Sequence, residues 1–156
     1  MKLTLCAVGR LRAGPEKTLV DDYLLRFDRT GRALGLGPAR VVQVEDKRGV
    51  GMTAEAALLD KAIPTGAVRV MLDERGKSMT SPDFAACLAR FRDDGRADLA
   101  LVIGGADGID PDLRAGADVL LSLGPMVWPH MLVRAMLAEQ LYRAASILAG
   151  APYHRV

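Results

Sequence analysis

Cysteine is scarce in this chain: among its 156 residues only Cys6 and Cys87 are cysteines. Neither has a second cysteine or a histidine at the spacing of a metal site, so the sequence predicts no metal centre and no disulfide framework. We expect both thiols to be reduced and to lie in the core, as is usual in the cytoplasm.

Long apolar runs are lacking as well. No stretch approaches the roughly 20 apolar residues that a membrane span needs. Residues 1–8 form a short strand-like run and not the longer apolar segment of a secretory leader. We therefore expect a cytoplasmic protein with no membrane partner.

The chain also has little excess charge of either sign. Its formal net charge of +2 does not by itself predict a nucleic-acid binder, although it permits a local basic patch, and we expect no DNA partner. The cations are mostly arginine, sixteen against five lysines, and arginine suits bidentate contacts to phosphate. The base composition of the genome is an alternative explanation of the same excess.

What the chain does have is apolar content and a regular pattern. Half of the residues are apolar, which is enough for a packed core, and the length predicts one domain over residues 1–156. Strand-like and helical patterns alternate throughout. The expected strands are 2–8, 40–44, 68–72, 99–103 and 117–123, and the expected helices are 15–31, 53–63, 81–94, a short one from 110, and 129–148. This alternation predicts an α/β fold with a mainly parallel sheet and helices on both faces.

Three polar residues stand where helices are expected to begin. Thr53, Ser81 and Asp110 each precede a helical pattern, so we expect them to be the N-caps. Residues 73–77 are polar and follow an apolar run, which predicts an exit loop after the third strand.

In a parallel sheet the ligand site lies beyond the carboxyl ends of the strands, so the candidate loops are those at Gly9, Asp73, Gly104 and Gly124. Gly104 and Gly105 form a double-glycine turn, where backbone can approach a ligand closely. The turn lacks the Gly-x-Gly spacing of a dinucleotide site and the Lys-Ser/Thr pair of a phosphate loop. A tight turn before the cap at Asp110 is the alternative.

Residues 123–129 join a strand to the final helix. Their backbone amides suit an uncharged heteroaromatic ligand, and the side chains of Met126, Val127 and Trp128 suit packing against one. The alternative is a hydrophobic connector in which Trp128 fills the core.

The final helix carries three charged residues and a histidine of interest. Glu139 and Arg143 are four apart with the acid first, which predicts an ion pair on the helix surface. Arg134 lies on the same helix and faces either a phosphate or nothing, and His130 is expected to be structural.

The tail places an aromatic ring, an imidazole and a permanent cation in succession, as Tyr153, His154 and Arg155. That combination suits recognition of a base and its phosphate. The alternative is a frayed terminus, because chain ends are usually loose.

These segments resemble a known family. Residues 101–108, 129–134, 139–144 and 152–155 are similar to the bacterial pseudouridine N3-methyltransferases of the large ribosomal subunit, which are small members of the SPOUT class. Residues 1–9 and 47–49 fit as well, and the length and the order of elements agree from end to end.

The resemblance implies properties that residue spacing does not show. Members of the family thread the C-terminal segment through a loop to form a trefoil knot, form homodimers with the sites at the subunit interface, and bind S-adenosylmethionine in the knotted loops. No metal is implied. Carried over to this chain, the cofactor residues are Leu72, Gly104, Gly105, Leu123, Gly124, Pro125, Met126, Val127, Trp128 and Pro129.

The implied substrate is a pseudouridine in a stem-loop of 23S rRNA, methylated at N3 in the assembled ribosome. A cation near the base favours its imidate, and a neutral histidine can accept or relay the N3 proton. Arg155 and His154 are the candidates for these roles, and Tyr153 stacks on or orients the base.

Three other functions are weighed against this one. The chain could be a SPOUT methyltransferase that acts on tRNA, although it has no room for an added RNA-binding domain. It could be a non-catalytic ribosome-binding protein that keeps the fold. A small-molecule α/β enzyme that binds phosphate at the Gly104 turn is disfavoured, because the chain lacks a phosphate motif.

Overall fold

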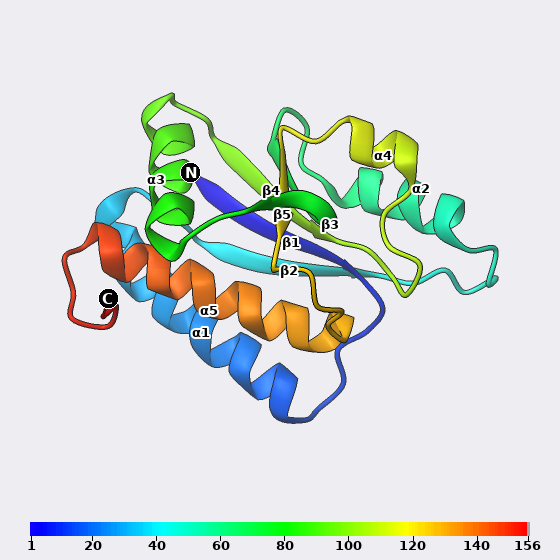
Figure 1. Cartoon of the computed structure of the whole chain (residues 1–156), viewed down its shortest axis with the longest axis horizontal. Helices are drawn as coiled ribbons and strands as arrows, with labels where there is room; N and C mark the ends of the chain where they lie inside the picture. Colours follow the sequence, from blue (N-terminus) through cyan, green and yellow to red (C-terminus); the bar gives the residue numbers. More distant parts are fainter. Residues whose placement is uncertain (156) are drawn as a thin grey trace.

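Strands and helices alternate through the computed structural model, which describes residues 1–155 (Figure 1). The elements are β1 (Lys2–Val8), α1 (Pro15–Gly31), the 3₁₀ turn η1 (Arg32–Leu34), β2 (Ala39–Val44), α2 (Met52–Ala62), β3 (Val68–Ser78), α3 (Ser81–Asp93), β4 (Asp98–Ile103), α4 (Pro111–Ala115), β5 (Val119–Ser122) and α5 (His130–Leu148). The expected order of elements is confirmed.

The strands form one five-stranded sheet in the order β2-β1-β4-β3-β5, and the four neighbouring pairs are all parallel. β1 and β4 occupy the middle and are almost fully buried, which explains why both read as continuous apolar runs. The predicted parallel sheet is therefore confirmed.

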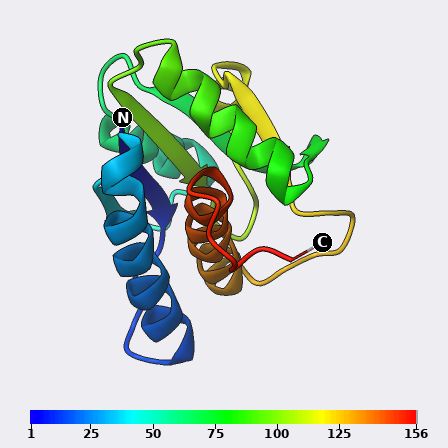
Figure 2. The ribbon, with the colours of Figure 1, turned by 90° about the vertical axis from the view of Figure 1, so that its left-hand side faces the viewer.

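Helices cover both faces of the sheet (Figures 1 and 2). On one face α1 and α3 both pack against α5, over a core that includes Leu3, Leu5 and Ala7 of β1. On the other face α2 and α4 cover a smaller core that includes Cys6 and Val8 of the same strand. The alternation of side chains along β1 thus supplies both cores, and the expected core position of Cys6 is confirmed.

Two of the three expected caps are wrong. The N-cap of α3 is Thr80, whose hydroxyl accepts from the Asp83 backbone N–H, and Ser81 is already inside the helix. The N-cap of α2 is Gly51, and Thr53 is the second residue of the helix. Asp110 caps α4 as expected, because its side chain accepts from Asp112 N at 2.9 Å.

The exit loop expected at 73–77 is in fact part of β3, which runs on to Ser78. Leu121 of β5 is paired both with Leu72 and with Lys77, and the register shifts between them, so residues 73–76 bulge around β5. A Cβ on Gly76 would lie 2.6 Å from the Leu120 backbone, so a glycine permits this crossing. The sequence does not indicate the pairing of these residues with β5, because polar side chains such as those at 73–77 are typical of loops.

Every helix within residues 1–155 is too short or too polar to span a bilayer. The knot that the resemblance implies stays a prediction.

Candidate active site

Residues 72–75 in the middle of β3 and the segments that follow β4 and β5 line a cavity of about 340 Å³, which we call the loop pocket. Eight of the ten residues expected to bind a cofactor line it; Pro125 and Pro129 are outside its lining. The eight are Leu72, Gly104, Gly105, Leu123, Gly124, Met126, Val127 and Trp128. The structure therefore brings together one strand segment and two loops that are far apart in sequence.

The floor of the loop pocket is the turn after β4. Gly108 N donates to Gly105 O at 3.1 Å, and the two residues form an isolated bridge. A Cβ on Gly104 would lie 2.5 Å from the Gly108 carbonyl carbon and 2.9 Å from Ile109. A side chain on Gly104 would run into the turn itself, so only glycine lets the turn close this tightly against the pocket.

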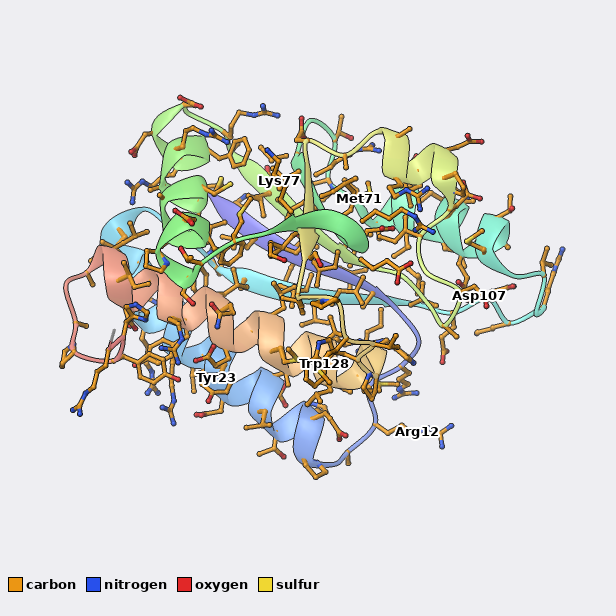
Figure 3. All side chains as sticks on the ribbon, viewed as in Figure 1. Arg12, Tyr23, Met71, Lys77, Asp107 and Trp128 are labelled. Carbon is orange, nitrogen blue, oxygen red and sulfur yellow. The ribbon has the colours of Figure 1, made fainter. Side chains whose placement is uncertain are left out.

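One wall of the loop pocket is apolar and exposed. Val127 is 91% exposed, Met126 is 68% exposed and Trp128 is 37% exposed, and Figure 3 shows Trp128 near the start of α5. The alternative in which Trp128 fills the core is wrong. Such an open apolar surface suits a heteroaromatic ligand or another chain.

Another part of the lining is polar and includes Asp73, at one of the candidate loops expected from the sequence. Asp73 has a side chain that is 5% exposed, and it accepts hydrogen bonds from Arg75 N and from Arg114 Nη1 at 3.2 Å. Burial alone would raise the pKa of the Asp73 carboxyl, but these donors outweigh it and the pKa is lowered. The expected exit loop gave no sign that this carboxylate would be buried and paired.

Arg134 faces the protein interior, so the expectation that it meets phosphate or nothing is wrong. Its side chain is 1% exposed and donates to the Val8 carbonyl and, at 3.5 Å, to Gln43 Oε1. It therefore fixes α5 to the ends of β1 and β2. His130 lines the loop pocket one turn earlier, and burial and then the Arg134 cation lower its pKa.

A second cavity of about 540 Å³, the helix groove, lies between α1, α3 and α5. It shares residues 121–124 with the loop pocket, so the two cavities are adjacent. Its walls are mostly apolar, with Leu19, Phe84 and Met136 among them, and Glu139 and Gln140 stand at one end. The groove thus connects the loop pocket with the middle of α5.

The tail is docked on α5 rather than frayed (Figure 2). Tyr153 donates its hydroxyl hydrogen to Glu139 Oε1 at 3.0 Å, and its ring packs at a tilt of 53° against Tyr142, with 4.5 Å between centroids. Burial, the Tyr23 hydroxyl and the Glu139 carboxylate raise the pKa of Tyr153. Arg143 lies over the same ring at 4.8 Å. The structure therefore holds two of the three expected catalytic side chains, Tyr153 and His154, near Glu139, and leaves Arg155 exposed.

The ion pair of Glu139 and Arg143 is formed as expected, at 2.5 Å, but it is not a plain surface pair. The two side chains are 18% and 25% exposed, and both contact the tail. Sequence reasoning missed this role, because an i,i+4 pair gives no sign of a third partner.

No three His, Cys, Asp or Glu residues within 1–155 are grouped closely enough to hold a metal ion. The groups that the site offers are backbone amides and carbonyls, apolar side chains and the charged pairs around Asp73 and Glu139. They suit an organic ligand in the loop pocket and a planar or charged group near the tail.

Comparison with known proteins gives the same family over the whole length. A family model described as "Predicted SPOUT methyltransferase" matches residues 1–154. The chain is 74% identical over 156 residues to the "Ribosomal RNA large subunit methyltransferase H" of Ruegeria pomeroyi, and 66% identical to the protein of the same description from Cereibacter sphaeroides. Each alignment covers 100% of both chains.

Among solved structures, the chain resembles a probable methylase family protein from Haemophilus influenzae Rd KW20. The TM-score is 0.52 at 10% identity, over 99% of this chain and 70% of the other. At that identity the likeness shows the fold alone.

Proposed function

Since the chain belongs to the SPOUT methyltransferase family, and within it to the ribosomal RNA large subunit methyltransferases H, we propose that it methylates N3 of a pseudouridine in 23S rRNA, with S-adenosylmethionine as the methyl donor. The proposed substrate is the assembled ribosome in the cytoplasm. The observation that carries the proposal is the 74% identity to a relative of that description over the whole chain.

The loop pocket supports the choice of donor. Residues 104–108 line the cavity, and their turn can close tightly because Gly104 has no side chain. Amides there and at residues 123–124 suit the polar edge of an adenine ring, and Trp128 and Val127 suit its faces. The residues present therefore fit S-adenosylmethionine.

When bound, S-adenosylmethionine supplies a methyl group on a sulfonium sulfur, so that a nitrogen–carbon bond forms while the carbon–sulfur bond breaks and leaves its electron pair on sulfur. The protein must hold the acceptor nitrogen in line with the methyl group and exclude water. In our proposal the tight turn of the loop pocket holds the reacting groups in line, and the apolar wall at Met126 and Val127 excludes water.

The N3 position of the base is an imide, which attacks only after it has lost its proton. We assign Arg155, the exposed cation of the tail, to stabilise the resulting negative charge, Tyr153 to orient the base, and His154 to contact the imide. Tail residues that are docked near Glu139 and an open groove that leads from Glu139 toward the loop pocket support this assignment.

The exposed apolar surface supports a homodimer. Leu19, which is 42% exposed, lines the helix groove, and Val127 and Met126 flank the adjoining pocket. A partner subunit laid across both cavities would cover these side chains and bring its tail to the loop pocket. Sedimentation of the wild-type chain should give a dimer, and a monomer with full activity would refute this part.

The proposal is tested with ribosomes from a strain that lacks this protein. Purified chain and S-adenosylmethionine are added to intact ribosomes, to free 50S subunits and to tRNA, and each RNA is digested and examined by mass spectrometry. We expect N3-methylpseudouridine in the intact ribosomes alone. A methyl group gained only by tRNA, or bound donor without transfer to any RNA, would refute the proposal in favour of the two alternatives.

A matched pair of variants tests the tail. Deletion of residues 153–156 should abolish methylation and leave S-adenosylmethionine binding measurable by calorimetry, because the loop pocket does not include the tail. Gly116→Ala, at the C-cap of α4 and outside both cavities, serves as the control and should keep both. Full turnover in the truncated chain would exclude a catalytic tail.

A further inference from the structure

The hydrogen bonds around His154 define which of its two ring nitrogens carries the hydrogen. Arg143 donates to Glu139 Oε1 from Nε at 3.0 Å and again from Nη2, so two of its nitrogens are held by one carboxylate oxygen. Its remaining nitrogen, Nη1, lies 3.3 Å from His154 Nδ1. The Arg143 guanidinium thus contacts both Glu139 and His154.

A guanidinium has hydrogens to donate and no lone pair to offer. The contact with Arg143 is therefore a hydrogen bond only when His154 Nδ1 is the acceptor. The hydrogen of the neutral imidazole must then be on Nε2, because the tautomer of a histidine is set by what its other nitrogen binds. Tyr153, which donates to the same Glu139 oxygen, keeps the carboxylate and the guanidinium in place.

His154 Nε2 is shielded from water, and it has no hydrogen-bond partner within residues 1–155. A donor in that position is costly to leave unpaired, so an acceptor would be favoured there once substrate binding uncovers the nitrogen. Both carbonyl oxygens that flank N3 of a pseudouridine are acceptors of the right kind.

We propose that Arg143, held by Glu139, is a positioning residue that fixes His154 as a hydrogen-bond donor through Nε2, and that His154 donates to a carbonyl of the substrate base and does not remove its N3 proton. The proposal rests on the function proposed above and assigns His154 the opposite hydrogen-bonding role from a general base. The N3 proton then leaves to solvent, and the hydrogen bond from Nε2 stabilises the negative charge that the imidate spreads onto its oxygen.

The tautomer is measured first, because that measurement needs no substrate. Long-range ¹H–¹⁵N correlation spectra of the full-length chain separate the ring signals of its two histidines, and a His130→Gln variant assigns them. We expect His154 to carry its hydrogen on Nε2. In Arg143→Met the donor to Nδ1 is lost, and the Nδ1–H form should become populated. The assignment would be overturned if wild-type His154 carried its hydrogen on Nδ1. It would also be overturned if the tautomer of His154 did not change in Arg143→Met.

The catalytic role is tested with three substitutions that differ in where they can donate. His154→Gln places an amide N–H close to the position of Nε2 but cannot accept a proton, whereas His154→Asn places its amide near Nδ1. We expect His154→Gln to keep about a tenth of the wild-type kcat or more, and His154→Asn and His154→Ala to lose about 100-fold. KM for S-adenosylmethionine should not change in any of the three.

Equal loss of kcat in His154→Gln and His154→Ala, with unchanged melting temperatures, would show that a proton acceptor is needed and would refute the donor role. Failure of the wild-type chain to methylate any ribosomal substrate would instead refute the proposed function, and the tautomer spectra would still decide the role of Arg143. The two proposals therefore fail in different experiments.

Discussion

Substituting Gly104 tests the idea that the turn after β4 has no room for a side chain. An added Cβ would lie 2.5 Å from the carbonyl carbon of Gly108 and 2.9 Å from Ile109 Cγ1. Gly104 is buried and the main obstacle is backbone, so the clash cannot be relieved by turning a side chain. The turn itself must open.

Overpacking of this kind costs about 1–3 kcal/mol. The smaller conformational freedom of alanine in the unfolded chain returns about 0.4–1 kcal/mol. We therefore expect Gly104→Ala to lower the free energy of unfolding by about 1–2 kcal/mol, which for a chain of this length lowers Tm by about 2–8 °C.

The same opening displaces the floor of the loop pocket. Calorimetric titration should show S-adenosylmethionine binding at least about tenfold weaker, since loss of one or two aligned backbone hydrogen bonds has that size. Thermal melts followed by circular dichroism give the stability. The two measurements use the same purified protein.

Two other glycines, Gly116 and Gly105, provide the controls. A Cβ on Gly116 would make an ordinary contact of 3.4 Å, so Gly116→Ala should change neither quantity appreciably. A Cβ on Gly105 would meet the Glu55 carboxylate at 2.7 Å, and because that side chain can turn away, Gly105→Ala should lower Tm less than Gly104→Ala. Wild-type Tm and wild-type affinity in Gly104→Ala would refute the close packing of the turn.

Other predictions follow from titratable groups and the tryptophan. The pKa of Asp73 is lowered in the fold, so its carboxylate stabilises the protein at pH values above the unfolded pKa of about 3.9, and this stabilisation is lost as the pH falls through the folded pKa. Asp73→Asn also leaves Arg114 without its carboxylate partner, and it should lower the free energy of unfolding by about 1–3 kcal/mol at pH 7. Urea titrations of this variant should show a smaller loss of stability at acid pH than wild type, and the same loss as wild type would contradict this. Burial raises the pKa of the Cys6 thiol to about 11, so iodoacetamide at neutral pH should modify Cys6 only after unfolding, whereas early alkylation of Cys6 ahead of the half-buried Cys87 would argue against its burial. Trp128 is the single tryptophan and lines the loop pocket, so its fluorescence should change on binding of S-adenosylmethionine, and a constant spectrum during calorimetrically detected binding would place the donor elsewhere.

Sequence reasoning succeeds here where one local pattern decides one local structure. Continuous apolar runs identify the strands, because a parallel sheet is buried on both faces, and α1 begins at Pro15 and ends at Gly31 as predicted. The glycine turns after β4 and β5 are visible for the same reason, since strand ends in such a sheet gather at one edge. Most of the loop pocket could therefore be predicted from residue order alone.

The failures occur where two distant segments must meet. The bulge at residues 73–76 depends on pairing with β5, the burial of Asp73 depends on Arg114, and the burial of Arg134 depends on the ends of β1 and β2. None of these partners is within helical or strand spacing of the residue that it changes. A single sequence contains no signal for such contacts, so charged residues there look like solvent-exposed ones.

The position of the tail along α5 bears on how the site is completed. His130, on the loop pocket, and Glu139, which anchors Tyr153, are nine residues apart on one helix, which is about 14 Å at 1.5 Å per residue. Methyl transfer needs the reacting atoms about 3–3.5 Å apart. A tail docked on its own helix therefore cannot reach the pocket's far wall unless the base spans the helix groove or a partner subunit presents its tail from the other side. Mixing Gly104→Ala with tail-deleted chain, at a donor concentration too low to fill the weakened pocket, decides between these arrangements. Restored turnover in the mixture requires one subunit to supply the pocket and the other the tail, whereas no restoration, in mixed dimers verified by mass, requires both from one chain.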